Sequence, residues 1–387
     1  MRKFMGSVDL RQIYTPIGQM AIFVAGAGAL CSLIMVVLAL IFQGSGADHA
    51  LQATQGVGIF TYTVGNLPQV LIDGMTIGFV YAAIALGYTM VYGVLQFINF
   101  AHSEIFAVGA FCGVEALIAL NGAGILAKAG YLGSYGYFGL ALLIGMAAAG
   151  GLAVLVERVA YRPLRGSPTL VALISAIGVS FALQDVIRLV ESLTTGQFYR
   201  VIPTFGNFDD RIPLIRLGSK VIDIQVKSVV VILAAMVMLV GLNYLVRATK
   251  VGKAIRAVSQ DKNTASIMGI GVNAMISLTF LVGGSLGGAA GVLYALKFTR
   301  IDPFVGFMPG IKAFAAAVLG GIGNLTGALL GGMVLGMIES FAGAYLDTYT
   351  QGAFGAEYKD MVAFLILILV IIFRPNGLLG EQVSQKA

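Results

Sequence analysis

Long apolar runs separated by short polar breaks dominate the chain. A helix needs about 20 mostly apolar residues to cross a bilayer, at about 1.5 Å of rise per residue. The pattern therefore predicts an all-α, polytopic bundle of transmembrane helices with about 8–10 spans. The expected spans are residues 17–42, 70–95, 105–120, 140–156, 170–190, 228–246 and 275–296, a longer run at 311–345 and a short run at 361–373.

The run at 311–345 is long enough for two pieces and is interrupted by glycine. The sequence Gly-Gly-Ile-Gly-Asn at 320–324 is the expected turn, so we predict a broken or re-entrant helix here. Further glycines at small-xxx-small spacing, at 327, 331, 332 and 336, favour tight helix packing. The polar stretch 43–66 is predicted to be a loop, and 191–227 a longer polar connection.

Composition supports a membrane location. Hydrophobic residues make up 58% of the 387 residues and charged residues only 11%, whereas a soluble domain has about 25% charged residues. So few charges do not make a water-exposed surface, and much of the surface must face lipid. The net charge of +6 does not indicate nucleic-acid binding, because the basic residues are dispersed and tryptophan is absent.

The basic residues predict the orientation. The leader before residue 17, the segments 158–165 and 247–262, and the tail after 373 hold thirteen of the 24 basic residues. Basic loops favour the cytoplasm, so we expect a cytoplasmic N-terminus. The alternative for 17–42 is a signal peptide, but its apolar core would span only about 7–15 residues.

Three regions of the chain are distinguished. We expect an N-terminal extension at 1–66, with one extra transmembrane helix and an external loop. A transmembrane domain follows at 67–380, and a cytoplasmic tail at 381–387.

Signatures of enzymes are absent from the sequence. It contains no G-x-x-x-x-G-K-[ST] phosphate loop, no H-E-x-x-H pair and only two histidines. Its two cysteines, Cys31 and Cys112, lie in apolar runs without a neighbour at metal-ligand spacing. We therefore expect movement of a solute rather than catalysis, with no metal and no cofactor in this chain.

Polar residues between the second and third runs form the first candidate site. Asn99, His102 and Glu104 either belong to the solute pathway or its gate, because polar groups at membrane depth are costly, or cap a helix. In the second interpretation Asn99 is the N-cap and Glu104 lies in the first turn. Gly321 and Asn324, in the expected turn of the broken helix, are further candidates for the pathway.

An internal repeat is a second hypothesis. Residues 97–102 and 304–309 each follow a span rich in glycine and tyrosine and each precede a helix rich in alanine and glycine. Duplicated halves are common in transporters.

The basic segment 247–271 is too polar to span the membrane. Short helices here would place small and apolar side chains on one face, while Lys253, Arg256 and Lys262 stay solvated. Such an element suits a groove in a cytoplasmic partner, and a basic loop near anionic lipid is the alternative. The expected face consists of Ala254, Ala257, Val258, Ala265 and Met268.

Several motifs in one order resemble the branched-chain amino acid permeases of ABC importers, a family that includes relatives for urea and short amides. The motifs are YAAIALGYTMVYG at 81–93, INFAHSE at 98–104, ERVAYRPLR at 157–165, LISAIG at 173–178 and KAFAAAVLGGIGN at 312–324. They extend over about residues 70–380. Ser103 departs from the pattern, which usually has glycine there, so the backbone geometry at this point is in question. Residues 1–66 precede the usual start of the family.

The resemblance implies a subunit without catalytic activity in the bacterial inner membrane. Its partners would be a second homologous permease, two cytoplasmic ATPase subunits that use ATP, and a periplasmic binding protein. A permease for urea or amides, and an ion-coupled secondary transporter, are the alternatives. The segment 247–271 would couple to the ATPase through Lys253, Ala254, Arg256, Ala257, Asp261, Ala265 and Gly269.

Overall fold

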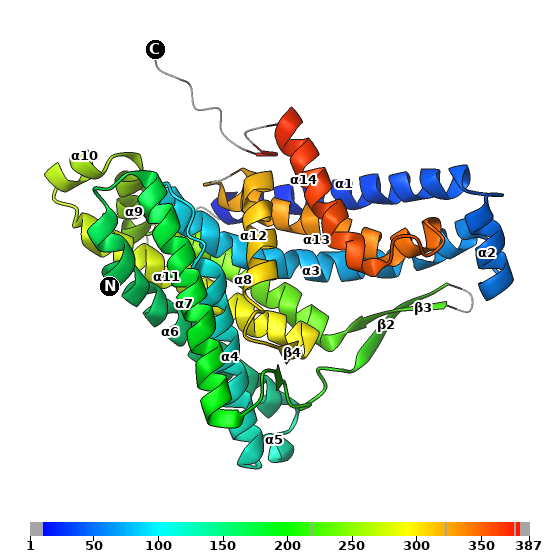
Figure 1. The fold of residues 1–387 in the computed structure, drawn as a ribbon, viewed down its shortest axis with the longest axis horizontal. Helices are drawn as coiled ribbons and strands as arrows, with labels where there is room; N and C mark the ends of the chain where they lie inside the picture. Colours follow the sequence, from blue (N-terminus) through cyan, green and yellow to red (C-terminus); the bar gives the residue numbers. More distant parts are fainter. Residues whose placement is uncertain (1–10, 218–219, 322, 375–376, 380–387) are drawn as a thin grey trace.

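Eight helices of the described chain are long and apolar enough to cross a bilayer, which confirms the predicted helical bundle (Figure 1). The computed structural model describes residues 11–217, 220–321, 323–374 and 377–379. The eight helices are α1 (Arg11–Ile41), α3 (Ile59–Leu95), α4 (His102–Gly122), α6 (Tyr131–Val156), α7 (Thr169–Thr195), α8 (Val226–Ala248), α11 (Val272–Phe298) and α13 (Leu325–Tyr349).

Shorter elements connect these helices. The short α-helices are α2 (Gly46–Gln55), α5 (Ile125–Lys128), α9 (Lys250–Gln260), α10 (Lys262–Ile267), α12 (Phe307–Gly320) and α14 (Lys359–Phe373). A π-turn (Glu157–Tyr161) and a 3₁₀ turn (Arg162–Leu164) follow α6, and a second 3₁₀ turn (Ala356–Tyr358) precedes α14. Two small antiparallel pairs, which we did not predict, join β1 (Arg200–Val201) to β4 (Arg300–Ile301) and β2 (Arg211–Leu217) to β3 (Lys220–Gln225).

Helix α3 is the centre of the bundle, because it packs against α13, α11, α12 and α8. Its antiparallel crossing with α13 depends on the predicted glycines. A Cβ at Gly332 would meet the backbone of Ala82, and a Cβ at Gly336 would meet the backbone of Gly78. Small residues let the two backbones approach closely, as expected for helices that pack in lipid.

The prediction of a loop at 43–66 was wrong, because this stretch forms α2 and the first turns of α3. Asp48 connects the two helices: its carboxylate accepts the backbone N–H of Ile59 at 2.7 Å and that of Gly44 at 2.9 Å. The Ile59 hydrogen bond, followed by the Gly44 bond, lowers the pKa of Asp48. Leu51 and Ile59 pack together beneath this contact. This polar stretch can be helical because the Asp48 carboxylate accepts the N–H groups of Gly44 and Ile59, which lie near the starts of the two helices and have no partner within a helix.

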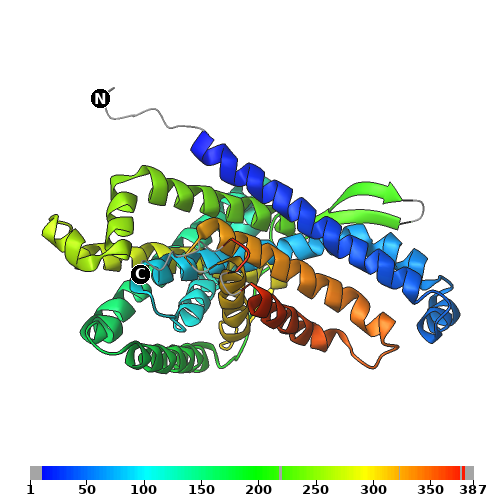
Figure 2. The same ribbon diagram turned by 90° about the horizontal axis from the view of Figure 1, so that it is seen from above.

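The basic segments gather at one end of the bundle. The loop after α6 contacts the start of α11 through a hydrogen bond between Arg165 and Asn273, and α9 packs on α8, α3 and α11. The backbone N–H of Leu378, which follows α14, donates to the Leu319 carbonyl at the end of α12. The connecting elements α2, α5 and β2–β3 lie away from this end (Figures 1 and 2). This arrangement agrees with the predicted parity of the spans.

The connection between α7 and α8 carries basic residues although we expect it on the external side. Three of them form ion pairs with acids: Arg200 with Glu191 at 2.8 Å and also with Glu115, Lys227 with Asp209 at 2.9 Å, and Arg211 with Asp223 at 3.1 Å. Their charges are therefore neutralised locally and do not oppose the orientation.

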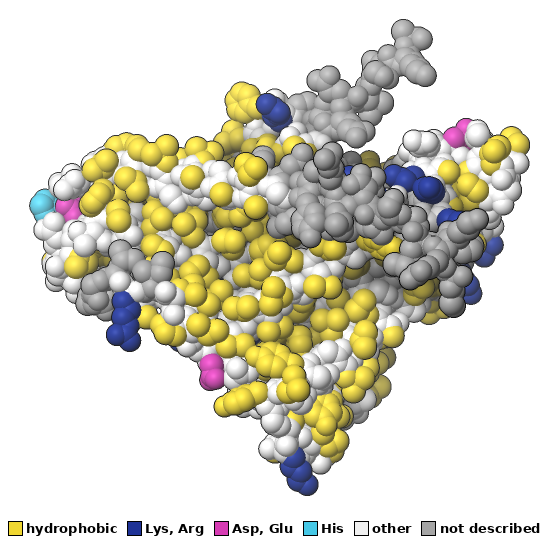
Figure 3. All heavy atoms as spheres, turned by 180° about the vertical axis from the view of Figure 1, so that it is seen from behind, with side chains coloured by type: hydrophobic (Ala, Val, Ile, Leu, Met, Phe, Trp, Pro, Cys, Tyr) yellow, Lys and Arg dark blue, Asp and Glu magenta, His cyan; other side chains and the backbone are white. Residues whose placement is uncertain are grey.

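Apolar side chains cover the outside of the helices (Figure 3), while the few charges in this view lie mainly near its edges. Leu132, Ile22 and Val237 are 87%, 77% and 71% exposed in the isolated chain. Such residues face lipid or another membrane subunit, because water does not tolerate so continuous an apolar surface.

We expect Gly336→Val to lower the unfolding temperature in detergent, because the added side chain forces α3 and α13 apart. Overpacking of this kind costs about 1–3 kcal/mol. Gly241→Val on α8 is the matched control, since a Cβ there meets nothing within 4 Å. Equal unfolding temperatures for the two variants, measured by fluorescence-monitored heating, would contradict the close crossing.

Candidate translocation and coupling sites

Two long helices end at a left-handed residue that is not glycine, and the chain then turns back into the protein. Helix α3 ends at Gln96, with φ of 60°, and α11 ends at Thr299, with φ of 62°. Left-handed backbone is costly for such residues and collects at functional sites. Each return segment, 97–101 and 300–306, leads into a new helix, α4 or α12.

The new helices start inside the protein and meet N-terminus to N-terminus. A Cβ at Gly306, the N-cap of α12, would lie 2.8 Å from Oε2 of Glu104, and a Cβ at Gly310 would overlap the Cβ of Ser103. Figure 1 shows α12 in the upper half of the view and α4 in the lower half. The segments of the hypothetical repeat thus occupy equivalent places with opposite direction, although a repeat in the sequence stays a prediction.

Helix α12 does not span a bilayer by itself. Its 14 residues extend about 21 Å, against about 30 Å for the hydrocarbon core. Irregular backbone at membrane depth is tolerated only where protein covers it. The return segment meets this condition, since Ile301, Val305 and Gly306 are buried. The predicted broken helix is confirmed, because α12 ends at Gly320 and α13 begins at Leu325.

The first candidate residues lie at this junction, fully covered by the chain. Asn99, His102 and Glu104 are 3%, 1% and 0% exposed. His102 meets Tyr88 edge to face, with 4.6 Å between ring centroids, and Gly87 of α3 leaves room for its ring. Among the described residues, Asn99 Nδ2, His102 Nε2 and Glu104 Oε2 have no hydrogen-bond partner. Polar atoms buried without a partner are rare and costly, which marks this junction.

One part of the capping interpretation was wrong. Ala101 is the N-cap of α4, and Asn99 instead accepts a hydrogen bond of 2.6 Å from the hydroxyl of Tyr161. Glu104 lies in the first turn, as predicted. Ser103 has no left-handed backbone; its hydroxyl donates to the Phe100 carbonyl at 2.7 Å, and its Cβ lies against Gly310. The serine therefore fits because its neighbour is glycine.

Gly321 and Asn324 lie at the far end of α12 and have structural roles there. Gly321 has a φ of 105°, and the Asn324 side chain accepts the N–H groups of Thr326 and Gly327 at 3.1 and 3.2 Å, capping α13. Asn99 belongs to a small hollow closer to the junction. That hollow measures about 10 Å³, which holds roughly one water and no solute, and is lined by Tyr88, Thr89, Tyr92, Ile98, Asn99, Phe314 and Ala317.

Residues 377–379 pack against this end of α12. Leu378 and Leu379 donate their N–H groups to the carbonyls of Leu319 and Gly320 at 2.8 and 3.1 Å, and Asn324 Nδ2 donates to the Leu379 carbonyl at 2.9 Å. We call residues 377–379 the C-terminal strap. The strap satisfies carbonyls at the end of α12 that the helix leaves unpaired.

An ionic cluster that was not predicted from the sequence lies beside the junction. Lys312 of α12 pairs with Glu339 of α13 at 3.1 Å and with Asp360 of α14 at 2.7 Å, and Lys359 pairs with Glu339 at 3.1 Å. The Tyr81 hydroxyl donates to Glu339 at 2.7 Å. The signal in the sequence was the presence of charged residues inside or beside apolar runs. This signal did not predict the cluster, because its members belong to four helices that are separate in the sequence.

The predicted coupling segment folds into α9 and α10. Thr249 caps α9 by accepting the Gly252 N–H at 2.9 Å. Asp261 caps α10 and accepts the Thr264 hydroxyl at 2.5 Å and the Asn263 N–H at 2.8 Å. These bonds, with the Thr264 hydroxyl first, lower the pKa of Asp261. Gly269 ends the element with a φ of 82°.

The predicted small-residue face of this segment is wrong as a single surface. Val258 and Ala265 are buried against the chain's own helices, at 0% and 4% exposure, and Ala254 and Ala257 are half-buried. Lys253, Arg256 and Lys262 are exposed, as expected. The apolar residues that project are Ile267 and Met268, 85% and 76% exposed. Helical spacing explains this difference: α10 begins after its cap at Asp261 and turns Ala265 toward the protein, so that Ile267 and Met268, two and three residues later, point outward.

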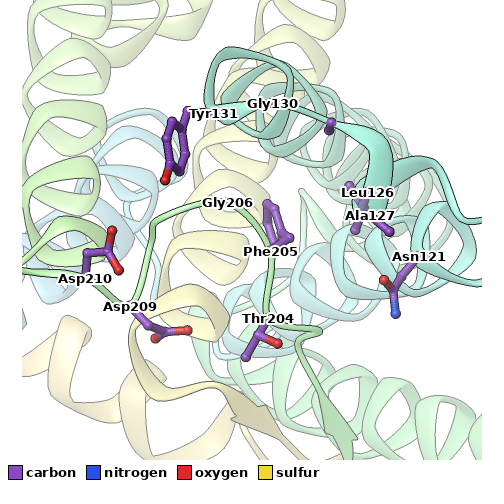
Figure 4. Close-up of a pocket in the computed structure, with 11 residues that line it drawn as sticks. Asn121, Leu126, Ala127, Gly130, Tyr131, Thr204, Phe205, Gly206, Asp209 and Asp210 are labelled. Carbon is purple, nitrogen blue, oxygen red and sulfur yellow. The ribbon is translucent and has the colours of Figure 1, made fainter.

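A wider hollow of about 690 Å³ lies at the opposite end of the bundle, between α5, the start of α6 and residues 204–210 (Figure 4). Asp209, Asp210 and Tyr131 line it, together with backbone at Gly130 and Gly206. No residue predicted for the pathway or the coupling segment reaches it.

Comparisons with known proteins give a consistent result. The family model described as the branched-chain amino acid transport system permease component matches residues 70–371. The chain is 37% identical over 318 residues to the high-affinity branched-chain amino acid transport system permease protein BraD of Pseudomonas aeruginosa, covering 82% of this chain and 97% of the relative.

Further relatives agree. Identity is 38% over 326 residues to the permease protein LivH of Escherichia coli K12, with the same two shares. It is 29% over 301 residues to a probable permease LivH of Methanocaldococcus jannaschii, covering 77% of this chain and 87% of the relative. No solved structure matches the chain significantly.

We expect Leu378→Pro to loosen the end of α12 that the strap covers, because proline has no N–H to donate to Leu319. One backbone hydrogen bond contributes about 1 kcal/mol, so hydrogen exchange of residues 314–321 should accelerate by about fivefold. Leu378→Ala keeps the donor and serves as the control. Unchanged exchange in the proline variant would show that the strap does not hold α12.

Proposed function

The chain belongs to the family of permease components of branched-chain amino acid transport systems, and from this we propose that it is the membrane-spanning permease subunit of an ATP-driven importer for branched-chain or related neutral amino acids. The observation that carries the proposal is an identity of 37–38% to named permeases over 97% of their length. The family model also covers the motifs on which the sequence-based resemblance depends.

The geometry supports a transport role. Half-helices whose N-termini meet inside a bundle are a recurrent way to build a solute pathway, because these ends carry partial positive charge. Here the ends of α4 and α12 meet at Glu104 and Gly306, with unpaired polar atoms around them. The small hollow at Asn99 leaves no passage, so we assign this conformation to a closed state of the pathway.

We place the contact with the ATPase at the tip of α10. Ile267 and Met268 project from an element whose remaining exposed side chains are mostly polar or basic, and an exposed apolar pair suits a hydrophobic groove of a partner. Asp261 and Gly269 hold this tip through a helix cap and a left-handed turn. Ala254, Ala257 and Ala265 would then support the tip rather than enter the groove.

Partners and location follow from the proposed role. The chain contains no phosphate loop, so ATP hydrolysis requires separate ATPase subunits at the end that carries α9 and α10. A second homologous permease would cover exposed apolar helices, and a periplasmic binding protein would deliver the solute to the opposite end. We therefore propose that the chain lies in the inner membrane of a bacterium.

We expect proteoliposomes that contain the whole complex to accumulate labelled leucine when the binding protein and ATP are supplied. Omission of ATP should abolish the accumulation. Labelled urea, tested in parallel, should stay at background. Uptake of urea without uptake of leucine would overturn the proposed substrate class, and uptake without ATPase subunits would overturn the importer class.

We expect the double variant Ile267→Glu/Met268→Glu to lose at least about 90% of uptake, because two carboxylates do not enter an apolar groove. Its unfolding temperature should match the unmodified chain, since both side chains are largely exposed. Ile267→Leu/Met268→Leu keeps the apolar surface and should retain uptake. Co-purification with the ATPase measures the contact directly; normal co-purification and uptake of the Glu variant would contradict the assignment.

A further inference from the structure

The buried ionic cluster has equal numbers of opposite charges. Lys312 and Lys359 supply two positive charges, and Glu339 and Asp360 supply two negative charges. The side chains of Lys312 and Glu339 are only 8% and 3% exposed, whereas those of Asp360 and Lys359, at the edge of the cluster, are 26% and 37% exposed. Charges inside a membrane protein are retained at high cost and are usually paired and functional. A neutral set around the buried Lys312–Glu339 pair is therefore a built feature of this bundle.

The cluster joins the half-helix α12 to three other helices. Tyr81 comes from α3, Lys312 from α12 and Glu339 from the middle of α13, and Lys359 and Asp360 form the first turn of α14. The Tyr81 hydroxyl bonds to Glu339 and accepts from Lys312 at 3.3 Å. Lys312 is the member of the cluster that belongs to the helix starting inside the protein, so its ion pairs join the N-terminal half of α12 to the three other helices. The C-terminal half meets α13 through backbone contacts at Gly320, Gly327 and Gly331.

The position of Lys312 on α12 connects the cluster to the junction. Gly310, two residues earlier, lies against Ser103, and Gly306 lies against Glu104. A shift of α12 along its axis would carry these glycines away from α4. At the opposite end of α12, the C-terminal strap is held by backbone hydrogen bonds to Leu319 and Gly320 and not by ion pairs.

We propose that Lys312 is a positioning residue for transport, which holds half-helix α12 against the start of α4 through the cluster of Glu339, Asp360, Lys359 and Tyr81. The proposal rests on the proposed transport function and goes beyond it, because it assigns the position of the pathway-lining half-helix to one buried set of charges. The residues need not touch the solute.

Charge neutrality offers a way to separate this role from simple stability. Lys312→Met leaves one excess negative charge in the cluster, and Glu339→Gln leaves one excess positive charge. Both single variants should lower the unfolding temperature of the complex in detergent, because an unpaired buried charge is strongly unfavourable. The double variant Lys312→Met/Glu339→Gln is neutral again, since Lys359 and Asp360 remain, and should recover most of the unfolding temperature.

Transport should not recover with stability. In proteoliposomes with the binding protein and ATPase subunits, we expect the double variant to take up leucine at least about tenfold more slowly per assembled complex. Lys312→Arg keeps the charge and should restore a substantial part of the rate. Arg188→Met removes a surface ion pair on α7, with Arg188 51% exposed, and is the matched control with unchanged uptake.

Hydrogen exchange of residues 302–314 gives a readout that does not depend on the solute. The double variant should exchange faster in this segment than the unmodified complex, while residues 325–336 of α13 stay protected. If the double variant recovers both stability and uptake, the cluster is only structural and the proposal is overturned. If uptake is lost while hydrogen exchange of residues 302–314 is unchanged, the proposal is overturned as well. Faster exchange in a complex that never transports leucine would leave Lys312 as the positioning residue and refute the proposed substrate instead.

Discussion

A polar group inside a bilayer must find its partner within the protein, and the organisation of this chain follows from that requirement. Two helices start at membrane depth, where their first N–H groups have no water to bond. The return segments supply the partners: the N–H groups of His102 and Phe307 donate to the carbonyls of Asn99 and Phe304, each at 3.1 Å. Glycine at Gly306 and Gly310 then lets the two helix starts come close together. The surrounding helices then have to pack tightly enough to keep water and lipid away from this junction.

The same requirement explains the central place of α3. This helix contacts α12, α4 and four further long helices, α13, α11, α8 and α1, and its glycines allow the close approach of α13, α4 and α11. Where it carries polar side chains, they face specific partners: Tyr81 meets the ionic cluster and Tyr88 meets His102. The core of the bundle is thus a set of close backbone crossings with a few polar contacts, rather than a conventional apolar core.

Different contacts hold the two halves of α12. The C-terminal half crosses α13 backbone against backbone, because a Cβ at Gly331 would meet the Ala316 carbonyl and a Cβ at Gly327 would meet the Gly320 carbonyl. The strap bonds to the same end of the helix. The N-terminal half is joined to α13 and α14 by the ion pairs of Lys312. Close backbone packing and buried charges therefore act together on this one half-helix.

The sequence by itself determined the class of protein, the apolar spans, the break at 321–324 and the amphipathic character of 247–271, because each depends on local hydrophobicity, glycine spacing or charge. It also placed Glu104 in the first turn of α4. Tertiary structure decided the rest: that 43–66 is helical, that Asn99 bonds to Tyr161, and that Ala265 is buried while Ile267 and Met268 project. The ionic cluster belongs to this second group as well. Its members come from four helices, and only the packing of those helices brings opposite charges within reach of one another.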